Sequence, residues 1–127
     1  MSDGAPTERS STGSVAAAIS NGVVRLMNEY TGRGPTRART YISDDLVTVV
    51  LRDTLTKGER SLVSDGRTEL VLSTRKAFQT TMEDELVALV EDLTGRKVFA
   101  FLSDNHIEPD IAVETFVLDA ADGERSA

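Results

Sequence analysis

The sequence predicts an α+β fold of two layers, in which a four-stranded antiparallel sheet of two hairpins packs against two main helices and one short helix. Three observations support this prediction. Two long stretches carry apolar residues at helical spacing. Each stretch is followed by two short runs typical of strands, joined by polar residues. The chain has 127 residues and no cysteine, so it fits one core without disulfides. The predicted order is α-β-β-(α)-α-β-β.

The first half is predicted as a helix and a hairpin. Apolar residues at helical spacing predict a helix over 14–31, and these are Val15, Ile19, Val23, Leu26, Met27 and Tyr30. Gly32 suits the left-handed position after a helix, and Pro35 favours extended chain. A strand then leads to a tight turn at Asp44 and Asp45. The run 46–51 is apolar on both faces, which predicts an inner strand.

The second half repeats this order after a short helix. Thr56 and Glu59 have capping-box spacing and open a helix over 56–64. A long helix over 67–93 ends at Gly95, and strands follow over 98–102 and 111–118 with a polar loop over 103–110 between them. Both main helices end in Thr-Gly-Arg, which is consistent with duplication or with the shared chemistry of helix ends. Either origin predicts a pseudo-symmetric sheet with its helices on one face.

Composition limits the domain organisation and the functional class. Residues 13–118 form the predicted single domain, while residues 1–12 and 119–127 are polar and are predicted to be disordered tails. The net charge of −7 argues against general nucleic-acid binding. The N-terminus lacks the apolar core of a signal peptide, and no stretch is apolar enough to span a membrane. We therefore expect a cytoplasmic protein, with no direct membrane insertion.

The residues that could carry chemistry do not form a recognisable catalytic, cofactor or metal site. His106 lies near Asp104, Glu108 and Asp110, but a solvated hairpin loop explains this grouping better than a metal or acid–base site. The glycines of segment 32–36 follow a helix, so the helix dipole has the wrong sign for a phosphate loop. We therefore predict that the protein is not an enzyme and has no cofactor.

A basic segment supplies the candidate contacts with a partner or an anion. These contacts are Arg33, Arg37 and Arg39. Arg37 and Arg39 fall on one face of a strand by alternation. They could bind an acidic partner or a small anion, or they could belong to a solvated sheet face balanced by acids across the strands.

The ordered region, about residues 15–118, resembles the MpsC family of small bacterial proteins. The resemblance rests on segments in a fixed order: Thr31-Gly32-Arg33-Gly34-Pro35-Thr36, 46–53 followed by Leu55-Thr56-Lys57-Gly58-Glu59, Arg75 with Phe78, Leu93-Thr94-Gly95, and 111–118. It implies a component associated with a Na+-translocating, membrane-potential-generating system related to bicarbonate uptake. It implies no catalytic residues.

The leading functional hypothesis is an accessory or regulatory protein that acts by binding another protein. The alternative is a small-ligand or anion sensor that uses the basic segment. We also predict a homodimer, because Phe99, Phe101 and Phe116 are expected on one face of the sheet and cannot all lie under the helices. The short helix or the terminal segments could cover that face instead.

Overall fold

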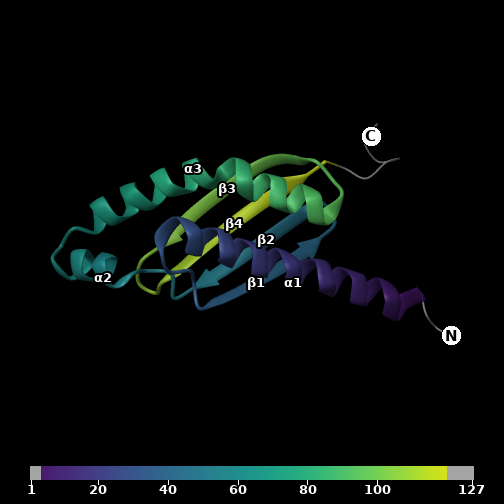
Figure 1. Cartoon of the computed structure of the whole chain (residues 1–127), viewed down its shortest axis with the longest axis horizontal. Helices are drawn as coiled ribbons and strands as arrows, with labels where there is room; N and C mark the ends of the chain where they lie inside the picture. Colours follow the sequence, from purple (N-terminus) through teal and green to yellow (C-terminus); the bar gives the residue numbers. More distant parts are fainter. Residues whose placement is uncertain (1–3, 120–127) are drawn as a thin grey trace.

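The computed structural model describes residues 4–119, with side chains from Thr12 onward. Its elements are α1 (Gly4–Thr31), β1 (Arg37–Ser43), β2 (Leu46–Arg52), α2 (Lys57–Ser64), α3 (Thr68–Thr94), β3 (Val98–His106) and β4 (Ile111–Leu118). The strands form one antiparallel sheet in the order β1-β2-β4-β3. Figure 1 shows α1 and α3 lying together over one face of this sheet. The α+β prediction, with two hairpins and helices on one face, is confirmed.

The core lies between the two helices and the inner face of the sheet. Side chains from both helices and from the two central strands are fully buried there, among them Ile19 and Val23 of α1, Leu86 and Val90 of α3, and Phe116 of β4. Alternate residues of β2 and β4 are buried, so the remaining residues of these strands point to the opposite, outer face. The inner position of segment 46–51 is confirmed by the neighbours of β2 on both sides.

The predicted helix ends follow from local chemistry. The Thr56 hydroxyl caps α2 by accepting a hydrogen bond from the Glu59 N–H. The Glu59 carboxylate in turn accepts one from the Thr56 N–H, which completes the capping box. Gly95 ends α3 with a φ of 72°, and Gly32 follows α1 with a φ of 79°. Both glycines adopt the left-handed conformation that other residues rarely take.

α1 begins at Gly4 rather than at Ser14, so residues 4–12 are helical where the sequence predicted a disordered tail. This segment is polar and shows no helical repeat of apolar residues, so the sequence pattern did not predict a helix here. Pro6 is compatible with the helix because it falls in the first turn, where its missing N–H costs no helical hydrogen bond. Figure 1 shows this end of α1 projecting past the sheet. The remaining residues of the predicted tails, 1–3 and 120–127, lie outside the described residues.

β3 is longer and less regular than predicted. It continues to His106, so the predicted loop over 103–110 shrinks to a turn of residues 107–110. Its polar second half still pairs with β4 because inward polar side chains find partners on α3, as with Asn105 and Gln79. Between Val98 and Ala100 the register shifts, which places Val98 and Phe101 on the inner side.

The three phenylalanines do not share a face, and that prediction is wrong. Phe101 and Phe116 pack together in the core with ring centroids 5.0 Å apart. Phe99 is 75% exposed. The register shift in β3 separates Phe99 from Phe101, and period-two counting along the sequence cannot detect such a shift.

Candidate functional site

Three arginines gather at one end of the outer sheet face, and we call Arg37, Arg39 and Arg52 the arginine cluster. Arg37 and Arg52 are direct partners across β1 and β2, and Arg39 lies two residues along the same face. All three are exposed. Within residues 12–119, none of them forms an ion pair. Arg39 contacts the ring of Tyr41, with 5.5 Å from its guanidinium carbon to the ring centroid.

An open depression of about 640 Å³ adjoins the arginine cluster along the outer edge of β1. The cluster lines one side of it, and Ser20, Asn21 and Val24 of α1 line the other. A hydrogen bond of 2.7 Å between the hydroxyls of Ser20 and Thr40 fixes α1 beside this strand. The arrangement combines unpaired cations with hydroxyl and amide groups, which suits carboxylates or another anion.

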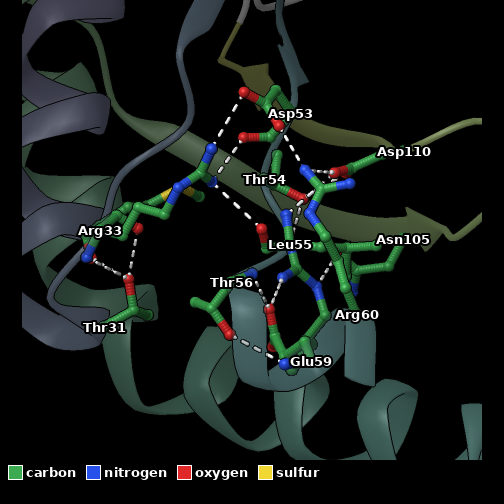
Figure 2. Close-up of polar contacts among 12 residues, drawn as sticks. Thr31, Arg33, Asp53, Thr54, Leu55, Thr56, Glu59, Arg60, Asn105 and Asp110 are labelled. Carbon is green, nitrogen blue, oxygen red and sulfur yellow. Dashed lines mark hydrogen bonds and ion pairs between the residues drawn. The ribbon is translucent and has the colours of Figure 1, made fainter. Parts of the chain in front are cut away.

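Arg33 does not join the other two predicted contacts. Its guanidinium donates to the carbonyl oxygens of Asp53, at 2.8 Å, and Leu55, at 3.2 Å. It also pairs with the Asp53 carboxylate at 2.9 Å. Residues 34–36 separate Arg33 from β1, and Arg33 belongs to a second polar region (Figure 2). Arg52 lies beside Arg37 instead. The two residues are 15 positions apart in the sequence, so only the pairing of β1 with β2 shows that they are neighbours.

The second region is a network centred on the carboxylates of Asp53 and Asp110 (Figure 2). Asp53 accepts hydrogen bonds from Arg33, Thr36 and Arg60. The Thr36 hydroxyl and the two nearby guanidinium groups hold the pKa of Asp53 below its usual range. Asp110 accepts from the Thr54 hydroxyl at 2.7 Å and from the Leu55 N–H at 3.0 Å. The network thus ties the segment after β2 to the β3–β4 turn.

Arg75 extends the network to α3. Its three guanidinium nitrogens donate to Asn105 at 3.1 Å, to Glu59 at 3.1 Å and to the Thr54 hydroxyl at 2.7 Å. The side chains of Arg75 and Glu59 are 14% and 18% exposed. One largely buried arginine side chain therefore holds α2, α3, β3 and the loop after β2 together. These groups form hydrogen bonds with one another, which is typical of a structural role. We call Arg75 and its three partners the latch.

Glu114 lies at the buried end of this region, and no pattern in the sequence predicted it as a site residue. Its side chain is fully buried on the inner face of β4. The Gln79 amide donates to one oxygen of the Glu114 carboxylate at 3.4 Å, and the other oxygen has no hydrogen bond. Ser103 pairs with Glu114 across β3 and β4, and its hydroxyl also has no hydrogen bond. Burial raises the pKa of Glu114 to about 7, and the Arg75 charge and the Gln79 amide oppose this rise. Glu114 is therefore half protonated near neutral pH.

His106 does not assemble a metal site with the neighbouring acids. It ends β3 on the outer face, and its Nδ1 lies 2.8 Å from the carbonyl oxygen of Pro109. The Asp110 carboxylate points instead toward Thr54 and Leu55. Among the described residues, no three His, Asp or Glu side chains come close enough to hold a metal ion.

Comparison with known proteins places these features in a family. The family model for MpsC, described as a Na+-translocating membrane potential-generating system, matches residues 11–120. The chain belongs to the MpsC family. It is also similar to a Bacillus subtilis (strain 168) protein named uncharacterized protein YrhF, with 28% identity over 102 residues, which cover 78% of this chain and 84% of that protein. No solved structure gives a significant match.

The family match covers both the arginine cluster and the latch, since residues 11–120 include all of their members. The resemblance inferred from the sequence motifs is confirmed. In the part of the chain that the structure describes, the helices are too short or too polar to cross a bilayer.

Proposed function

We propose that this MpsC protein is a non-enzymatic accessory or regulatory component of a Na+-translocating membrane system. It acts on the cytoplasmic side by binding an acidic segment of a protein partner through the arginine cluster. The family description supports the link to the system. The proposed binding mode rests on the position of Arg37 and Arg52. These residues lie directly opposite each other, and neither forms an ion pair with a described residue.

Physical chemistry favours an anionic partner at this place. Like charges directly opposite on neighbouring strands are destabilising, and carboxylates from a partner would relieve that repulsion. The chain as a whole carries a net charge of −7, so on average its surface repels an acidic protein. A local basic cluster on an acidic protein therefore selects both the partner's charge and its orientation.

The depression beside β1 supports a polypeptide segment rather than a single small anion. It is open and runs from α1 across the edge of the strand to the outer face. An extended segment could follow that edge, where β1 has no strand neighbour among the described residues. Small anions remain the alternative ligand. Sulfate, phosphate or bicarbonate would then raise the melting temperature of the chain saturably, and Arg37→Glu with Arg52→Glu would abolish the rise.

The proposal is tested by binding of the purified chain to membranes of the source organism. Arg37→Glu with Arg52→Glu should reduce the retained protein at low salt by about tenfold or more, because attraction becomes repulsion at two contacts. The matched control is Arg25→Glu with Arg67→Glu, which changes net charge equally at two exposed residues outside the cluster. Equal retention of both double variants at low salt would contradict the proposal. A photo-crosslinker at position 37 identifies the partner.

A further inference from the structure

The outer face of the sheet remains uncovered by every described element. α1 and α3 occupy the inner face, and α2 packs against α3 rather than across the strands (Figure 1). The outer face is largely apolar and β-branched at its centre, with exposed apolar side chains toward its sides. Its central residues are Leu46, Thr48 and Val50 of β2 and Val113, Thr115 and Val117 of β4. Tyr41 is 52% exposed and Leu102 is 59% exposed.

The strand registers arrange the outer face in rows that cross all four strands. One row runs Tyr41, Thr48, Thr115 and Leu102, and the next runs Arg39, Val50, Val113 and Asp104. The second row therefore carries a cation at the β1 edge, an anion at the β3 edge and two valines between them. When two copies of this row face each other in opposite directions, the cation of each row lies opposite the anion of the other.

We propose that a second copy of the chain packs face to face on this surface, related by a two-fold axis that runs parallel to the strands between β2 and β4. This axis reverses the strand order, so β1 of one copy lies over β3 of the other. Because Arg39 and Asp104 lie in the same row, each Arg39 faces the partner's Asp104. The valines of the row meet at the centre, and Tyr41 meets the partner's Leu102. Aligned packing of two sheets about 10 Å apart accommodates this contact.

Charge decides between this axis and the other face-to-face arrangement. A two-fold axis across the strands would place β1 over β1 and bring the basic edges of both copies together. The parallel axis brings unlike edges together and is isologous, as closed dimers require. It uses Arg39 within the dimer and leaves Arg37 and Arg52 in the last row of the face, at the rim. The dimer therefore covers Arg39 and leaves Arg37 and Arg52 for the partner contact, and it does not depend on that contact.

The test is a charge swap in the full-length chain, read by sedimentation equilibrium over a dilution series. Wild type is expected to dimerise. Arg39→Asp alone and Asp104→Arg alone each convert two attractive contacts into two repulsive ones, which should raise the dimer dissociation constant on the order of 30-fold at low salt. The combined variant Arg39→Asp with Asp104→Arg restores the contact with reversed polarity, and it should return the dissociation constant to within a few-fold of wild type.

Several outcomes decide against the dimer. A monomeric mass of wild type at the highest concentration overturns it, and so does a combined variant that associates no better than the single ones. All three variants should keep the wild-type melting temperature under dilute conditions, since both side chains are exposed. Arg37→Glu with Arg52→Glu should leave the dimer constant within a few-fold of wild type while it weakens membrane binding. Failure of one proposal is thereby distinguishable from failure of the other.

Discussion

Replacing Arg75 with methionine is expected to lower the free energy of unfolding by about 3 kcal/mol. Methionine keeps much of the volume of the side chain but removes donors to Asn105, Glu59 and Thr54. The Glu59 side chain is only 18% exposed, so its carboxylate would lose its ion-pair partner in a poorly hydrated site. The cost arises from the groups left unpaired rather than from the net strength of the pair. Urea unfolding of the purified variant measures this effect.

The control is Arg67→Met. Arg67 pairs with Asp65 at 3.0 Å, but these side chains are 61% and 69% exposed. An exposed pair contributes about 0–1 kcal/mol, so this variant should stay close to wild type. If Arg75→Met were no more destabilising than Arg67→Met, the network around Arg75 would not be the latch that holds the helices to the end of the sheet.

The stability of wild type is expected to fall as the pH rises from about 4.5 to about 7. The pKa of Glu114 is about 7 in the folded protein, whereas the ordinary pKa of a glutamate is 4.5. Across this window the unfolded carboxyl loses its proton while the buried one keeps it. The folded state then binds more protons, and the free energy of unfolding decreases with pH. A difference of about 2.5 pKa units corresponds to a loss on the order of 3 kcal/mol, complete above pH 7.

Glu114→Gln removes this dependence because an amide does not titrate. The variant should match wild type near pH 4.5 and exceed its stability increasingly up to pH 7 to 8. Urea midpoints measured for both proteins at several pH values give the difference directly, since other titrating groups are common to both. A constant difference between the two proteins over pH 4.5–8 would mean that Glu114 ionises normally in the folded state.

The elements of the fold were predictable because their signals are local. Helical periodicity, the Thr56 capping box and the two helix-ending glycines depend on residues within a few positions of each other. The two hairpins follow from these signals, but they can join in several orders, and the pairing of β2 with β4 at the centre is seen only in the structure. The α-β-β order of the two halves gives a pseudo-symmetric sheet, while the origin of the halves by duplication stays a prediction.

The candidate site was only partly predictable because it depends on contacts between distant residues. Arg37 and Arg39 follow from alternation, but Arg52 joins them only through the β1–β2 register. Arg33 has the same charge as these residues, yet the chain turns away after it and its guanidinium meets Asp53. Glu114 occupies an inward position between Ala112 and Phe116, and either face of β4 was apolar enough to be the buried one.

The most direct test of the proposed function is the sodium-dependent membrane potential of cells that lack this gene and carry a plasmid copy. Wild type and Arg25→Glu with Arg67→Glu should restore the potential. Arg37→Glu with Arg52→Glu, present at the same cellular level, should leave it near the level of the deletion strain, because the arginine cluster could no longer bind its acidic partner. Full restoration by the cluster variant would contradict the account.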